Sequence, residues 1–201
     1  MNKDEIRQFL ASYEPIKERT ITIVDFSNVE KWKNSLGWEI GIQEMARLVK
    51  NFSYGNQTLR RFYYGSDYGP SEKSNTMVPW SENMIRRADI NRFEVVTKRV
   101  KYIKNPTNTD VKKCDLDVEM AVDLLKFESD FDQAVVFSGD GDLTYAMQYL
   151  YDNYGKTFIV FAARNHVSKE VIDCSKTGVI SRILFAEDFD YRLMNKHKHS
   201  R

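Results

Sequence analysis

The sequence predicts an α/β protein with a mostly parallel central sheet that helices cover on both faces. Short apolar runs, typical of strands buried on both sides, alternate with segments whose apolar residues recur at helical spacing. Strands that alternate with helices in this way pair in parallel, because each helix returns the chain to the end of the sheet where it started. The 201 residues, 42% of them hydrophobic, are enough to fill one compact core.

The first ninety residues are expected to form two strands, three helices and a loop. Helices are predicted where apolar residues recur every three or four positions, and strands where β-branched and aromatic residues form a short run. In chain order, these elements are a helix that ends before Pro15, a strand over 20–25, an amphipathic helix between 40 and 52, a strand over 58–64, a loop over 65–78 and a helix over 80–90.

The rest of the chain continues the same alternation. A strand from Phe93 to about Ile103 is followed by Asn105-Pro106-Thr107-Asn108, which breaks the chain because proline and asparagine favour turns. The elements expected beyond this break are a helix over 117–128, a strand over 134–138, a helix over 142–153, a strand over 157–162, a helix over 167–175 and a strand over 179–184.

The most informative segment is Phe137-Ser138-Gly139-Asp140-Gly141-Asp142, which ends the apolar run 134–137. In open α/β sheets, ligands bind just beyond the carboxyl ends of the strands, so Asp140 and Asp142 are expected at a binding position. Two carboxylates held close together repel each other and lose hydration. A hard cation would resolve this conflict, and the pair is therefore predicted to bind a metal.

A second acidic position follows the first strand. Asp25 ends the run TITIVD and begins Asp25-Phe26-Ser27-Asn28, so it is expected at the same edge of the sheet as Asp140. It is predicted either to ligate the metal or to act as a helix cap or turn former. In the first case, Asn28 would be a neutral ligand or would donate a hydrogen bond to substrate or to a ligand water. Ser138 would help to arrange the site.

Helical geometry adds a third acidic position. At about 100° per residue, Asp117 projects into the middle of the apolar stripe of the helix over 117–128. An unpaired buried carboxylate is costly, so Asp117 should meet a cation, cap the helix, or mark a helix that begins later. Asp123 lies nearer the edge of the stripe. It is predicted to be a hydrogen-bond partner of the metal ligands or an ordinary surface acid.

The net charge of +1 conceals two blocks of opposite sign. Residues 86–113 carry nine basic and three acidic side chains, whereas residues 115–142 carry nine acidic side chains against Lys126 alone. Part of each block is expected to be solvated surface, but the arrangement also suits an enzyme that holds cations with its acids and phosphates with its bases. The candidate phosphate contacts are Lys98, Arg99, Lys101, Lys104 and Lys113.

Alternatives remain open for these outer residues. The lysines between 98 and 104 could instead protect an edge strand from pairing with other chains. Aromatic side chains in the loop expected after Asn28 and at the end of the second strand could stack on unpaired bases or lie in the core. These are Trp32, Trp38, Tyr63, Tyr64 and Tyr68.

Four segments together resemble the NYN domain of the LabA/DUF88 type, a branch of the PIN-like nuclease superfamily. They are DFSN (25–28), CDLDVEMAVDLL (114–125), VVFSGDGDL (135–143) and SKEVIDCS (168–175). The usual KGVD of the family corresponds to Lys113 to Asp117, and the spacing to the next acid aligns Asp117 and Asp123 with the family positions. The usual SGDSDF is SGDGDL here, which removes a hydroxyl and an aromatic ring but no carboxylate.

The resemblance implies a three-layer α/β/α Rossmann-like sandwich and a divalent-metal-dependent nuclease that acts on RNA. It divides the chain into an N-terminal helical extension (1–19), an NYN/PIN-like domain (20–186) and a basic C-terminal tail (187–201). The residue chemistry agrees, because oxygen ligands without histidine select Mg²⁺ or Mn²⁺. The expected metal ligands are Asp25, Asp117, Asp140 and Asp142.

The principal hypothesis is therefore a ribonuclease that hydrolyses phosphodiester bonds of single-stranded RNA with a metal-activated water. The alternatives are a non-catalytic RNA-binding or regulatory NYN protein, and a phosphatase or nucleotidase acting on small phosphate esters. The resemblance also admits a homodimer.

No run approaches the ~20 apolar residues of a membrane span, so no membrane partner is predicted. Cys114 and Cys174 are expected to be reduced thiols, which agrees with a predicted cytoplasmic location.

Overall fold

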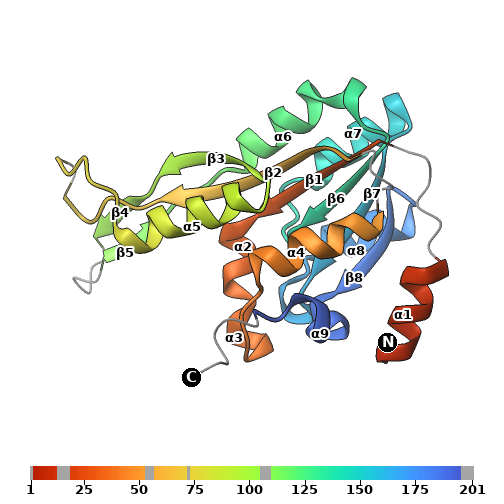
Figure 1. Ribbon diagram of the computed structural model, residues 1–201. Coiled ribbons are helices and arrows are strands. Elements are labelled where there is room, and N and C mark those ends of the chain that lie inside the picture. Colours follow the sequence, from red (N-terminus) through yellow and green to blue (C-terminus); the bar gives the residue numbers. More distant parts are fainter. Residues whose placement is uncertain (1, 13–18, 53–56, 72, 105–109, 196–201) are drawn as a thin grey trace.

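The computed structural model describes residues 2–12, 19–52, 57–71, 73–104 and 110–195. Its centre is a six-stranded sheet in the order β3-β2-β1-β6-β7-β8, in which every neighbouring pair is parallel (Figure 1). The strands are β1 (Thr20–Asp25), β2 (Gln57–Ser66), β3 (Glu94–Arg99), β6 (Gln133–Phe137), β7 (Thr157–Ala162) and β8 (Ile180–Phe185). The strand order reverses direction between β1 and β6, which is where such sheets bind ligands.

Helices cover both faces of this sheet, which confirms the predicted three-layer α/β fold class (Figure 1). Successive strand residues point to opposite sides, so Val24 packs in one core and Ile23 in the other. The core that contains Val24 lies against α1 (Lys3–Ser12), α2 (Phe26–Lys31), α4 (Ile42–Leu48), η1 (Val49–Phe52) and α5 (Pro79–Ile90). The core that contains Ile23 lies against α6 (Asp117–Lys126), α7 (Thr144–Tyr154) and α8 (Lys169–Lys176).

The strand predicted from Phe93 to Ile103 is in fact two strands. β3 is an edge strand of the large sheet. The chain leaves this sheet after Val100, whose N–H donates to the carbonyl of Ser66 (2.9 Å). It then forms β4 (Lys101–Lys104), which pairs antiparallel with β5 (Asp110–Lys113) in a separate ribbon that projects from one end of the sheet (Figure 1). The sequence concealed this break because both strands draw on the same β-favouring residues. The predicted turn over 105–108 lies outside the described residues.

Two short helices occupy the region predicted as a loop after Asn28. They are α2 and α3 (Lys33–Leu36), which ends at Gly37 in the left-handed conformation (φ 74°). Trp32, at their junction, is fully buried, so the core interpretation of this side chain is correct. Helices of four and six residues are too short for apolar periodicity to reveal them.

The described part of the predicted tail (187–201) packs against the domain. Phe189 in η4 (Ala186–Phe189) and Leu193 in α9 (Asp190–Leu193) are fully buried in the core. The carbonyl of Leu193 accepts a hydrogen bond from the Gly41 N–H (2.8 Å), which ties this end to the start of α4. In the segments that the structure describes, no helix is long and apolar enough to cross a membrane.

Candidate active site

Asp25 stands at the carboxyl end of β1, where it caps α2 and also reaches the neighbouring strand. Its Oδ1 accepts hydrogen bonds from Ser27 Oγ (2.8 Å) and the Asn28 N–H (3.1 Å). Its Oδ2 accepts a hydrogen bond from Ser138 Oγ (3.0 Å), just beyond β6. Burial raises the pKa of Asp25, and the nearby charge of Asp140 acts in the same direction. The helix cap predicted as one alternative is thus present, and it holds the carboxylate at the switch point of the sheet.

The turn after β6 places Asp140 beside Asp25. Ser138 Oγ donates to Asp25 and accepts from the Asp140 N–H (3.2 Å), so one hydroxyl links the two acidic positions. Gly139 allows the turn to lie against the backbone of the segment before α8, since an added Cβ would come within 1.7 Å of the His166 carbonyl oxygen. No other residue fits there without moving that segment.

Asn28 is fixed by two donors that converge on its side-chain oxygen. Oδ1 accepts from Trp32 Nε1 (2.8 Å) and from the Gly139 N–H (3.1 Å). A carbonyl oxygen has two lone pairs, and both are used, so Asn28 can offer a ligand its amide N–H groups but not this oxygen. Of the two roles predicted for Asn28, the geometry favours the hydrogen-bond donor. The sequence analysis named Trp32 only as a stacking or core residue and missed its support of Asn28, although its position four residues after Asn28 matches one helical turn.

Asp117 is the first residue of α6 and carries an elevated pKa. Its own N–H donates to Asp115 Oδ1 (3.1 Å), so Asp115, and not Asp117, makes the capping contact. Burial raises the pKa of the Asp117 carboxyl to about 7, with further contributions from Asp115, Asp25 and Asp140. The helix-cap alternative for Asp117 is therefore wrong. Its carboxyl group lies in the combined negative field of Asp25 and Asp140, the two acids at the strand ends.

The free energy of unfolding is expected to carry a contribution from Asp117 that falls as the pH rises from about 4 to about 7. In this window the folded protein holds a proton on Asp117, whose pKa is about 7, while the unfolded chain, with an ordinary value of 3.8, has released it. The resulting stabilisation is complete below the lower value and is lost as the pH passes the upper one.

Urea unfolding across this pH range tests the expectation. Relative to the wild type, Asp117→Asn should gain stability as the pH rises, because asparagine cannot titrate. The exposed Asp152→Asn on α7 is the matched control and should follow the wild type. A constant difference between wild type and Asp117→Asn would contradict the elevated pKa.

The other two predicted acids lie apart from this group. Asp142 is exposed, and its N–H donates to Asp140 Oδ1 (3.3 Å), so its backbone supports Asp140 while its carboxylate does not line the cleft described below. Asp123 is buried and accepts hydrogen bonds from Arg61 Nη2 (2.6 Å) and Tyr63 Oη (2.7 Å). The surface alternative for Asp123 is therefore wrong, and its carboxylate is engaged by Arg61 rather than by a candidate metal ligand.

A cleft of about 600 Å³ lies at the carboxyl end of β1 and β6. We call it the acidic cleft; it is lined by Asp25, Asn28, Asp115, Asp117 and Asp140, and on other sides by Lys31, Lys33, Lys112 and Lys113. Acids and bases from both charge blocks thus meet across one cavity. Lys31 and Lys33 are not among the phosphate contacts predicted from the sequence, which favours a loop after Asn28.

The donor set suits a hard cation that keeps part of its water. Among the residues described, no three His, Cys, Asp or Glu side chains converge on one point, so direct ligation by four aspartates is not formed. Mg²⁺ usually retains several waters and is held by one or two carboxylates together with substrate phosphate. Of the acids that line the cleft, Asp117 and Asp140 fit this mode, along with Asp25 Oδ2, which accepts one hydrogen bond from the described part of the chain, that of Ser138 Oγ.

The predicted phosphate contacts divide into two groups. Lys98 and Arg99 belong to the edge strand β3, and both have partners: Lys98 forms an ion pair with Glu119 (2.8 Å), and Arg99 lies over the Tyr68 ring (4.8 Å to the centroid). Lys101, Lys104 and Lys113 are exposed on the ribbon. Lys101 and Lys113 are direct cross-strand partners, an arrangement of like charges that costs stability and favours a bound anion.

The stacking alternative fails for two of the tyrosines. Tyr63 is fully buried and Tyr64 is 4% exposed, so neither presents a ring face to a base. Tyr68 is partly buried beneath Arg99. The half-exposed aromatic at the cleft is instead Trp80, the second residue of α5, which the sequence analysis did not single out.

Fold and site together define a Rossmann-like α/β protein whose acids gather where the strand order of a parallel sheet reverses. The sequence matches the NYN domain family over residues 19–181, and the chain belongs to this family, which is part of the PIN-like nuclease superfamily. The structure is similar to the crystal structure of VPA0982, a protein of unknown function from Vibrio parahaemolyticus RIMD 2210633. The TM-score is 0.68 at 21% identity, covering 89% of this chain and 97% of that one. This likeness concerns the fold. No curated protein matched the sequence significantly.

Proposed function

We propose that this protein is a divalent-metal-dependent ribonuclease of the LabA/DUF88 type that hydrolyses phosphodiester bonds in the acidic cleft. The observation that carries the proposal is the shared cleft of Asp25, Asp117 and Asp140. Burial and Asp115 raise the pKa of the Asp117 carboxyl to about 7, and Asp25 and Asp140 act in the same direction. A structural role does not need three acids at one edge of a sheet, because their repulsion costs stability. Lys31 and Lys113, which line the same cleft, suit the phosphates of a nucleic acid.

Each residue has a defined task in this reaction. A divalent cation held by one or two of the carboxylates of Asp25, Asp117 and Asp140, with waters as its other ligands, would offset phosphate charge and lower the pKa of a water molecule. Ser138 fixes the spacing of Asp25 and Asp140 through its two hydrogen bonds, and Asn28 presents amide N–H donors to the substrate. Lys113 and its cross-strand partner Lys101 would hold the phosphates that flank the scissile bond.

Product analysis tests the reaction class. Purified protein should cut end-labelled single-stranded RNA into shorter fragments in the presence of Mg²⁺ or Mn²⁺. Binding without cleavage would support a non-catalytic RNA-binding protein instead, and release of phosphate from mononucleotides would support a phosphatase or nucleotidase. A homodimer and a cytoplasmic location stay predictions.

The ribbon lysines are expected to set the salt dependence of RNA binding. The double variant Lys101→Ala/Lys113→Ala should reduce the slope of log affinity against log salt by about 0.7 for each lost phosphate contact on a single strand. Fluorescence anisotropy at several salt concentrations measures this slope. Lys98→Ala is the matched control and should change the slope less, since Glu119 already pairs with Lys98. An unchanged slope in the double variant together with aggregation would favour edge protection.

A further inference from the structure

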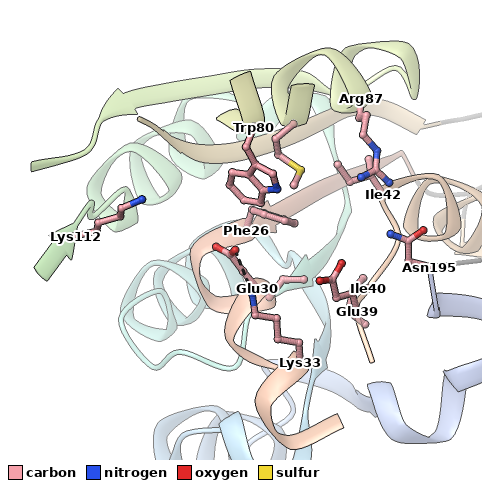
Figure 2. A pocket seen from close by; sticks show the side chains of 12 residues that line it. Phe26, Glu30, Lys33, Glu39, Ile40, Ile42, Trp80, Arg87, Lys112 and Asn195 are labelled. Atoms are coloured by element: carbon pink, nitrogen blue, oxygen red, sulfur yellow. Dashed lines mark ion pairs between the residues drawn. The ribbon is translucent and has the colours of Figure 1, made fainter. Parts of the chain in front are cut away.

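A second cavity of about 400 Å³ opens beside the acidic cleft (Figure 2). The two cavities share five lining residues: Phe26, Glu30, Lys33, Trp80 and Lys112. We call the second cavity the side pocket. Because the walls are shared, a chain whose phosphate lies in the acidic cleft can place an adjacent group in the side pocket without leaving the protein surface.

The side pocket has an aromatic wall that nothing in the fold requires. Trp80 is 52% exposed, although large aromatic side chains are usually buried, and its ring leans on Tyr64 with centroids 6.2 Å apart. Figure 2 shows the indole beside Phe26, with Ile40 and Ile42 completing the apolar lining. An exposed indole at the junction of two cavities is a stacking surface for a flat, apolar ring.

The charges of the side pocket are mixed and do not single out a phosphate as its occupant. Glu30, Glu39 and Arg87 all line it, and Lys33 is paired with Glu30 (3.6 Å; dashed in Figure 2). Lys112, at the edge of the pocket, forms an ion pair with Asp67 (2.6 Å). The lining is therefore mixed in charge and rich in hydrogen-bonding groups, which suits an uncharged heterocycle with polar edges.

We propose that the side pocket binds an unpaired nucleobase of the RNA whose backbone occupies the acidic cleft, with Trp80 as the stacking partner. The inference rests on the proposed function and adds a base-binding subsite to it. A base paired within a duplex cannot leave its stack without losing its partner, so the pocket selects single-stranded substrate.

The test measures binding in an Asp140→Asn background, in which cleavage is expected to be about 10²–10³-fold slower. The probe is a short single-stranded RNA with 2-aminopurine in place of one base, compared with the same strand in a duplex. Trp80→Ala should weaken binding of the single strand about tenfold and abolish the quenching of 2-aminopurine that stacking causes. Trp80→Phe should retain both signals. Trp80→Leu, which preserves an apolar contact with Tyr64 and so protects folding, should behave like alanine.

The control is Tyr145→Ala, which removes an 85% exposed aromatic ring on α7. It should bind both probes as the parent does. Equal binding by Trp80→Leu and the parent, or equal affinity for single strand and duplex, would overturn the inference. If the wild type still cleaved RNA in that case, the proposed function would stand. Failure of the wild type to bind or cleave any RNA would overturn both.

Discussion

Asp140→Asn is expected to lower RNA cleavage by about 10²–10³-fold while the protein remains folded, because the substitution removes a charge that acts in the transition state. Asparagine has nearly the same shape, and its side-chain oxygen can still accept the hydrogen bond from the Asp142 N–H. The loss would therefore report the missing charge in the acidic cleft and not a disturbed turn. Initial rates on end-labelled RNA, at saturating Mg²⁺ or Mn²⁺, measure it.

The same variant has a second readout that does not depend on activity. Asp140 is one of the charges that raise the pKa of Asp117, so its neutralisation should lower that pKa from about 7. The pH dependence of unfolding attributed to Asp117 should then shift to lower pH. Asp152→Asn, which removes an exposed acid from α7, should alter neither cleavage nor this profile. Normal cleavage by Asp140→Asn would place the reaction elsewhere.

Local patterns were sufficient to predict the parallel sheet and three of the acids that line the cleft, Asp25, Asp117 and Asp140. Asp25 and Asp140 each follow an apolar run, and the parallel connection rule alone brings the ends of such runs to one edge. Asp117 followed from the phase of an amphipathic helix. These predictions needed only short apolar runs and the helical spacing of 3.6 residues, both of which can be read directly from the sequence.

Contacts between distant segments could not be predicted in this way. Arg61 and Asp123 are 62 residues apart, and their pairing depends on how α6 lies across β2. The separation of β3 from β4 likewise depends on where the large sheet ends. Trp80 gave no signal as a cleft residue, because its exposure and its two neighbouring cavities exist only in the folded chain.

Removal of divalent cations is expected to abolish cleavage, and Mg²⁺ or Mn²⁺ should restore it. The acids of the cleft repel one another without a counter-ion, and among the residues that the structure describes no histidine lines the cleft to act as a base in place of a metal-activated water. EDTA treatment followed by titration of each ion, with fragment release as the readout, measures this dependence. Full activity in EDTA would contradict metal catalysis.

Thermal unfolding of the same samples gives an independent measure of cation binding. An ion that binds only the folded protein stabilises it by about 2.7 kcal/mol at a concentration of one hundred times its Kd, which corresponds to a Tm increase on the order of 5–10 °C for a chain of this size. The apparent affinity should increase as the pH rises through about 7, because the cation must displace the proton held by Asp117. Asp117→Asn should lose this pH dependence along with most of the Tm increase. A Tm increase that is equal in wild type and Asp117→Asn would show that the ion binds outside the acidic cleft.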